Sequence, residues 1–261
     1  MFPSLSRVVG SKARGFALAL RASAYASDGL CGRYSNTAGP EEIGKTFGPA
    51  LGVQIREPAG TGRYKIFPSE KVLTIVAGDE KPEPRMLRWG LIPSWAKDMK
   101  LSNLINATTE TLLSKGKYYG VPAESSHRAL IVADGFYEWM KAEDRKQKSQ
   151  PYRFTVDEGS VFALAGLWTV NHRVGKDPLE SCALLTCPPN PLVRPIHDRM
   201  PVLLADPESL RGWLSADLTA QEALTLCTPF PAERMSVRPV SRDVNKAGGI
   251  DGPELFEPPS A

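Results

Sequence analysis

The chain has 261 residues, of which 42% are hydrophobic and 23% are charged, as in an ordinary water-soluble globular protein. No apolar run approaches the length of about 18 residues that a transmembrane helix requires, so no such helix is expected. The formal net charge is +3, and residues 1–30 carry all of it, because the rest of the chain holds basic and acidic residues in equal number. A neutral body has no bulk field that attracts nucleic acid, so any such partner must be held by a local basic patch.

Residues 1–30 differ from the rest of the chain, since they are rich in arginine, serine and alanine and contain no acid before Asp28. We expect this N-terminal extension to be disordered or absent from the mature chain, and residues 31–258 to form one domain. Three origins stay open for the extension: a start placed too far upstream, with Leu30 at the true start; an untrimmed tail; and an organellar or other targeting sequence in residues 1–29. Without targeting, the protein is expected in the cytoplasm.

Turn, capping and alternation signals divide residues 31–258 into short elements. The first part is predicted to hold a helix at 40–47, strands at 71–77 and 86–92, and a loop that enters a short helix at 106–115. A strand at 128–139 is interrupted by Asp134-Gly135, a turn or bulge signal. Residues 141–150 are predicted to form a solvated hairpin tip.

The second part is predicted to hold strands at 151–156, 161–170, 181–187 and 200–204, followed by two helices. Asp206 is the expected N-cap of a helix at 207–214, and Thr219 with Glu222 has the pattern of a capping box. The tail from Pro239 is predicted to be irregular. Many strands with few, late helices predict an α+β fold, in which a single domain is built around a curved, barrel-like mixed β-sheet with a few peripheral helices.

The four cysteines are too few for a disulfide scaffold in a chain of this length, which favours a reducing compartment. Cys182 and Cys187 lie five residues apart in an apolar strand, so their side chains point to opposite faces and are poorly placed to share a metal ion. These two and Cys227 are predicted to be core residues. His127 and His172 are predicted to be exposed, and no metal ion or organic cofactor is expected.

The chemistry open to Cys31 depends on whether it begins the working polypeptide. A cysteine at the first position offers a thiol and a free α-amine, which together can condense with an aldehyde to an imine and close a five-membered thiazolidine ring. The α-amine has a reference pKa of about 7.7–8.0 against about 10.4 for lysine, so far more of it is uncharged and nucleophilic near neutral pH. An amide-bonded Cys31 has no such amine.

Five short motifs occur in a fixed order: CGRY at residues 31–34, RWGLIPSW at 88–95, NA at 106–107, ADGFYEW at 133–139 and HDRMP at 197–201. Together they resemble the SOS response-associated peptidase (SRAP) family, the abasic site processing proteins. The resemblance covers residues 31–258. It implies a covalent thiazolidine crosslink between an N-terminal Cys31 and the ring-opened abasic deoxyribose of single-stranded DNA, with self-cleavage as one way to expose the cysteine.

The resemblance assigns four residues to this chemistry. Cys31 would supply both nucleophiles, and the Asn106 amide would hold the amine or the sugar. Glu138 would shuttle protons during imine formation and ring closure. His197 would assist proton transfer at the sugar oxygen, including reversal of the crosslink, because histidine side chains change charge near neutral pH.

The resemblance also implies an interface with DNA. Arg33 and Arg199 would clamp phosphates, while Pro68 and Trp89 would lie against bases where the strand is kinked. The implied partner is single-stranded DNA that carries abasic sites, bound by a monomer, with nucleoid association if the protein is bacterial.

Each role has a plainer alternative. Glu138 could face solvent in an alternating strand, and His197 could form an ion pair in a surface loop. Asn106 more often caps a helix when it is considered alone. Trp89 could be a core aromatic, which is the role predicted for Trp95.

The sequence departs from the family pattern where DNA binding is concerned. Thr108 and Tyr119 stand at or near positions where arginine is common, and each lost phosphate contact lowers the salt dependence of single-strand binding by a slope of about 0.7. Two other functions therefore stay open. One is a thiol peptidase or hydrolase that uses Cys31 and His197 and works with an internal cysteine. The other is a non-catalytic single-stranded DNA-binding module.

Overall fold

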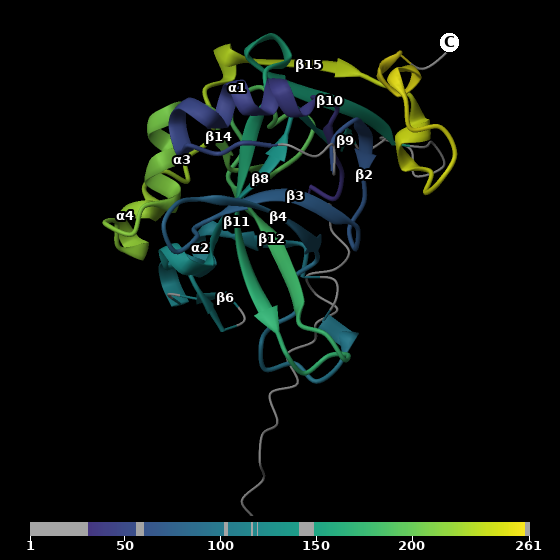
Figure 1. Ribbon diagram of the computed structural model, residues 1–261. Coiled ribbons are helices and arrows are strands. Elements are labelled where there is room, and N and C mark those ends of the chain that lie inside the picture. Colours follow the sequence, from purple (N-terminus) through teal and green to yellow (C-terminus); the bar gives the residue numbers. More distant parts are fainter. Residues whose placement is uncertain are drawn as a thin grey trace, which may run out of the picture.

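A computed structural model describes residues 31–55, 60–101, 104–115, 117–118, 120–140 and 149–258 (Figure 1). Within these ranges the chain forms two large β-sheets, a small two-stranded sheet and a few α-helices at the periphery. The N-terminal extension, residues 141–148 of the predicted hairpin tip and Tyr119 lie outside the described residues. No helix in the described ranges is long and apolar enough to cross a membrane.

The larger sheet closes into a barrel of five strands. Their order is β12 (Leu179–Cys187), β4 (Glu83–Trp89), β3 (Lys71–Val76), β8 (Arg128–Ala133) and β11 (Phe162–Asn171), and β11 returns to pair with β12. The pairing of β4 with β12 is parallel and the others are antiparallel, so the barrel is mixed. Short strands extend it: β5 (Asn106–Thr108) and β13 (Met200–Pro201) pair with β12, and β14 (Leu203–Leu204) pairs with β11.

The second large sheet is antiparallel throughout. Its order is β15 (Met235–Pro239), β10 (Gln150–Val156), β9 (Gly135–Met140), β1 (Tyr34–Asn36) and β2 (Arg63–Ile66). The residues after β15, yellow in Figure 1, fold back beside β2, where Asp251 pairs with Arg63 at 3.0 Å. Strands β6 (Lys117–Tyr118) and β7 (Val121–Pro122) form the separate two-stranded sheet.

Asp134 marks the point where the chain passes from the barrel into the second sheet, because β8 ends just before it and β9 begins just after it. Its buried carboxylate accepts hydrogen bonds from the Ser35 hydroxyl (2.6 Å), the Thr37 N–H (2.7 Å) and the Arg153 guanidinium (3.0 Å). A Cβ on Gly135 would lie 2.7 Å from Arg153 Nε, so glycine is needed for this close approach. The predicted interruption is confirmed, and it joins the two sheets.

Helices cover the outside of the barrel, where α1 (Pro40–Leu51) packs against α3 (Pro207–Leu214) and α3 against β8 (Figure 1). The predicted helix at 40–47 is correct in place but too short. It continues through Gly48 and Pro49, both poor helix residues, to Leu51, and its C-cap Gly52 has a φ of 67°, a left-handed conformation that glycine adopts without steric cost.

The later helices follow their capping signals. Asp206 accepts from the Ser209 N–H at 2.9 Å at the start of α3, and Thr219 forms the predicted capping box with Glu222 at the start of α4 (Ala220–Leu224). The short helix after residue 106 is α2 (Thr109–Lys115). The expected α+β fold around a barrel-like mixed sheet with few helices is thus confirmed.

Some single-residue expectations are met and others are wrong. Cys182, Cys187 and Cys227 are buried, as predicted. Trp95 was expected in the core but is 52% exposed, because it lies in the loop between β4 and β5 rather than in a strand. His172 is exposed as predicted, whereas His127 is half-buried.

Candidate active site

Cys31 is placed by the strand that follows it. β1 pairs with β9, and the pairing continues one residue toward Cys31 through the Tyr137 N–H, which donates to the Arg33 carbonyl at 3.0 Å. The Cys31 side chain is buried, and its thiol lies 3.7 Å from the same Arg33 carbonyl. This register places Cys31 near the Glu138 carboxyl on β9, so that each side chain shifts the pKa of the other.

Cys31 and Glu138 shift each other's protonation. Burial raises the pKa of the Cys31 thiol, and the nearby Glu138 carboxyl adds to the rise. Burial also raises the pKa of Glu138, with repulsion from Asp198 acting in the same direction and the hydrogen bond with Cys31 opposing it. Near neutral pH the thiol is therefore uncharged and the carboxyl is held toward its protonated form, in which it can donate a proton.

Asn106 approaches Cys31 from the barrel side. It begins β5, which pairs with β12 in parallel, and its side-chain Nδ2 donates to the Cys31 carbonyl at 3.2 Å. The alternative role of helix cap does not apply, because the hydroxyl of Thr108 accepts from the Thr111 N–H (3.3 Å) at the start of α2. The amide therefore serves the cysteine backbone rather than the helix.

His197 completes the group from the segment before β13. Its ring is almost fully buried, and Nε2 lies 4.0 Å from Oε2 of Glu138. The other ring nitrogen, Nδ1, lies 3.1 Å from both the backbone N–H and the carbonyl of Arg199 and 3.3 Å from the Asp198 carboxylate, so Nε2 is the nitrogen that faces the Glu138 carboxyl. Both plainer alternatives, a solvent-facing Glu138 and a surface His197, disagree with this burial.

Arg33 is the candidate anion contact nearest to these groups. Its guanidinium carbon lies 3.2 Å from the centroid of the Phe67 ring, and Nε and Nη1 have no hydrogen-bond partner among the described residues. Burial lowers the pKa of Arg33 to about 10, against the opposing charge of Glu70, so the side chain is still a cation near neutral pH. A stacked, incompletely paired guanidinium is suited to bind an anion.

The other three expected DNA contacts differ from one another. Arg199 is held by the Glu110 carboxylate through two hydrogen bonds of 2.7 and 2.9 Å. Pro68 is half-buried in the turn between β2 and β3, beside Ser69 with its φ of 78°. Trp89 is fully buried, so its ring presents no face to a base, and the alternative role of core aromatic fits it.

The packing of Trp89 explains its burial. Its Nε1 donates to the Ile105 carbonyl at 3.0 Å, and its ring meets Tyr34 edge-on, with centroids 5.2 Å apart. Trp89 thereby links the strand after Cys31 to the residue before Asn106. The exposed indole of Trp95, six residues later in the same motif, was missed, and only its place in a loop could have indicated it.

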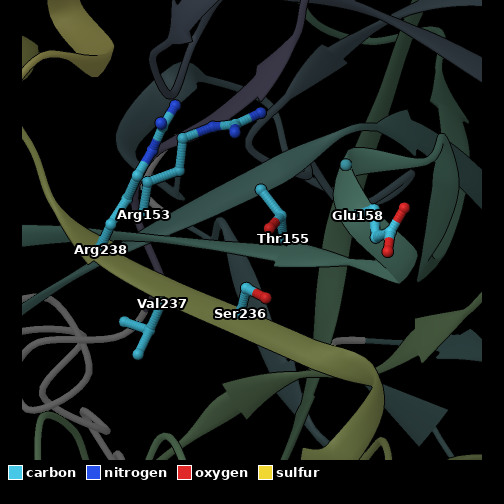
Figure 2. A pocket seen from close by; sticks show the side chains of 7 residues that line it. Arg153, Thr155, Glu158, Ser236, Val237 and Arg238 are labelled. Carbon is cyan, nitrogen blue, oxygen red and sulfur yellow. The ribbon is translucent and has the colours of Figure 1, made fainter.

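A pocket of about 290 Å³ lies away from these residues, between β10, β15 and the turn after β10 (Figure 2). Arg153, Thr155, Glu158, Ser236 and Arg238 line it. None of the expected site residues contributes to its lining. Arg153 also pairs with Asp134, so its guanidinium serves the junction between the sheets.

The fold and the site together define a class of protein: a small α+β barrel at whose edge a buried thiol, an amide, a carboxyl and an imidazole converge. The chain belongs to the SOS response associated peptidase (SRAP) family, whose sequence model matches residues 30–247. The expected family is therefore confirmed. No group of three or more potential metal-ligating side chains occurs in the part of the chain that the structure describes.

Relatives and solved structures agree with this assignment. The chain is 36% identical over 230 residues to the abasic site processing protein YoqW of Bacillus subtilis (strain 168), covering 87% of this chain and 99% of the relative. It is 30% identical over 232 residues to the abasic site processing protein YedK of Escherichia coli (strain K12), covering 88% and 100%. A crystal structure of a Bacteroides thetaiotaomicron protein has a similar fold, with a TM-score of 0.72 at 20% identity, covering 87% of this chain and 99% of that one.

Proposed function

We propose that this protein processes abasic sites in single-stranded DNA by forming a thiazolidine crosslink through Cys31, once Cys31 is the first residue of the polypeptide. The main support is the convergence of the four residues expected to react. The Cys31 thiol lies near enough to Glu138 for the carboxyl to raise the thiol pKa, the Asn106 amide donates to the Cys31 carbonyl at 3.2 Å, and His197 Nε2 lies 4.0 Å from the Glu138 carboxyl. The names of the relatives support abasic sites as the lesion.

The proposed reaction consumes one amine, one thiol and one aldehyde and releases one water. The Cys31 α-amine attacks C1′ of the ring-opened sugar, and the protonated Glu138 carboxyl donates a proton to the hydroxyl, which departs as water and leaves an imine protonated on nitrogen. The Cys31 sulfur then adds to the imine carbon, and the thiol proton passes to the Glu138 carboxylate, which restores the carboxylic acid. No oxidant or reductant is needed.

The remaining residues take positioning and binding roles in this proposal. Asn106 fixes the Cys31 backbone and so aims the amine. His197 moves a proton to or from the sugar hydroxyl that is freed when the ring opens, and in reverse when the crosslink is undone. Arg33 binds a backbone phosphate, and the exposed Trp95 takes the base-stacking role first expected of Trp89.

The decisive test uses protein that begins at Cys31 and a single-stranded oligonucleotide with one abasic site. A heat-stable adduct with the mass of protein plus DNA minus one water is expected on a denaturing gel and by intact mass. Cys31→Ala should give no such adduct. Cys31→Ser keeps the amine, so it should be trapped only when borohydride reduces the imine. An equally heat-stable adduct from Cys31→Ala would refute the mechanism.

The full chain provides the second arm of the test. With residues 1–30 attached, Cys31 lacks an amine, so no adduct is expected until the extension is removed. N-terminal sequencing of protein from its native host should find Cys31 first, whether through self-cleavage or another route. A native protein that retains residues 1–30 would contradict the proposal.

A thiol peptidase is the weaker candidate. Such an enzyme attacks with a thiolate, and burial raises the pKa of the Cys31 thiol instead of lowering it. Peptide cleavage by the full chain, lost in Cys31→Ala, would favour that function. A purely non-covalent single-strand-binding module would bind the oligonucleotide but give no adduct in any form.

A further inference from the structure

The Arg199 guanidinium forms a bidentate ion pair with the carboxylate of Glu110. Nη1 donates to Oε1 at 2.7 Å and Nη2 to Oε2 at 2.9 Å. Nη2 also donates to the Thr186 carbonyl at 2.6 Å, which fixes the plane of the guanidinium. The hydrogen bonds from Arg199 lower the pKa of Glu110, so the pair is ionised near neutral pH.

The pair bridges the two segments that carry active-site groups. Arg199 follows His197 by two residues, and its backbone N–H holds the imidazole through Nδ1. Glu110 lies in the first turn of α2, directly after β5, which begins at Asn106. An anion that binds at Arg199 is therefore close in the chain to both of these groups.

The shape of the pair matches the way in which arginine binds a phosphate. Two parallel N–H···O bonds from a planar fork fit a carboxylate and a phosphate equally well. The Glu110 side chain is 53% exposed and that of Arg199 only 19%. The carboxylate thus lies on the solvent side of the guanidinium, in the place that an incoming phosphate would take.

We propose that Glu110 is an internal competitor of the DNA backbone, which occupies the phosphate position on Arg199 in the free protein and leaves it when a strand binds. The inference rests on the proposed function. Because the Glu110 carboxylate is exposed to solvent, its pair with Arg199 is weak enough for such an exchange. Because the phosphate only replaces a carboxylate, Arg199 adds little net affinity for undamaged strands, and lasting attachment is left to the covalent step at an abasic site.

The test measures equilibrium binding of the full chain to an undamaged single-stranded oligonucleotide by fluorescence anisotropy over a series of salt concentrations. Glu110→Gln should bind about two- to fivefold more tightly, the range expected for removing a weak competing ion pair. The slope of log K against log salt should stay close to that of the wild type, because Arg199 makes the same phosphate contact in both bound states.

Two matched variants separate this effect from general electrostatics. Glu42→Gln removes the same charge from an exposed site on α1, so it should leave affinity and slope nearly unchanged. In an Arg199→Gln background, Glu110→Gln should have no effect, because the competitor then has nothing to block.

The outcomes are distinct. Weaker binding by Glu110→Gln would mean that Glu110 positions Arg199 in the bound state and would overturn the competitor role, as would unchanged binding. An equal gain in the Glu42→Gln variant would also overturn it. Failure of the wild-type chain to bind any single strand would instead overturn the proposed function, and this inference with it.

Discussion

His197 and Glu138 face each other inside the protein, with Nε2 of the imidazole 4.0 Å from Oε2 of the carboxyl and both side chains almost fully buried. The two groups come from different parts of the fold, Glu138 from β9 of the second sheet and His197 from the segment before β13 of the barrel. Burial raises the pKa of Glu138, which favours the protonated form of the carboxyl that faces the imidazole. In the proposed mechanism, this carboxyl is the proton donor on the cysteine side of the site.

The raised pKa of Glu138 predicts a pH-dependent gain in stability for Glu138→Gln. Between the unfolded pKa of about 4.3 and the raised folded value, the native state binds more protons than the unfolded state, so the unfolding free energy of the wild type falls as pH rises. Glutamine does not titrate. Urea unfolding over a pH series should show that the unfolding free energy of the variant, relative to that of the wild type, increases by up to about 1.4 kcal/mol per pH unit.

Glu42→Gln on the exposed face of α1 is the control for this series. A difference between Glu138→Gln and wild type that stays constant with pH would contradict the raised pKa. The same Glu138→Gln variant should form the crosslink more slowly, because an amide cannot donate the proton that removes water from the imine precursor.

His197→Ala is expected to slow reversal of the crosslink more than its formation. In the proposed mechanism, imine formation and its reversal both use the carboxyl of Glu138, whereas closing the sugar ring again after reversal needs a second group that takes the proton of the freed hydroxyl. A loss of about 10²-fold in the reversal rate is expected for one positioned acid–base group. Release of the oligonucleotide from purified adduct measures it, with the exposed His172→Ala as control. Equal slowing of both directions would contradict the separate role of His197.

The barrel strands could be predicted from sequence because they carry apolar runs bounded by turn residues, as at 71–77 and 181–187. Strands β1 and β2 have only three and four residues, too few for a periodic pattern. They are held by tertiary contacts: Ser35 and Thr37, in and beside β1, donate to the Asp134 carboxylate, and the backbone N–H groups of Tyr64 and Lys65 in β2 donate to Asp251. Strand β15 was missed because its residues are mostly exposed, as is common at a sheet edge.

The residues proposed to react could be named from motif order, but their environment could not be predicted from the sequence. Glu138 alternates with aromatic neighbours on β9, which normally indicates one solvent face. Here the residues after β15 cover one side of that strand, where Tyr137 packs with Val240 and Leu255, and the barrel side covers the other. The pairing of Arg199 with Glu110 also depends on two segments that only the fold brings together.

The burial of the cysteines predicts that the native protein resists thiol reagents. All four thiols are buried; burial raises the pKa of Cys182 and of Cys187 to about 12 and shifts Cys31 and Cys227 in the same direction. Ellman's reagent should therefore react at least about tenfold more slowly with native than with unfolded protein. After unfolding, four thiols should be counted in the wild type and one fewer in Cys31→Ala. A rapidly reacting thiol in the native full chain would contradict the burial of Cys31.

The buried pair of Asp134 and Arg153 is expected to be essential for folding. The side chains of Asp134 and Arg153 are only 5% and 7% exposed, and Asp134→Asn leaves the Arg153 guanidinium without its counter-charge. The unfolding free energy is therefore expected to fall by about 3–5 kcal/mol. Asp157→Asn, which breaks an exposed pair with Arg234 at 3.0 Å, should cost at most about 1 kcal/mol. Urea unfolding of both variants compares them directly. Similar costs would contradict the role of the junction between the sheets.

Trp95 was expected in the core but is exposed, and its exposure predicts that Trp95→Ala loses affinity for DNA. The indole is 52% exposed and lies close against Gly120, where an added Cβ would come within 3.2 Å of Nε1. A supported, exposed indole is suited to stack on an unpaired base, which contributes about 1–3 kcal/mol. Anisotropy with an undamaged single strand should show weaker binding by Trp95→Ala and near-normal binding by Trp95→Phe. Met99→Ala, a 39% exposed residue of the same loop, is the control, and an equal loss there would mean that the loop, not the ring, is responsible.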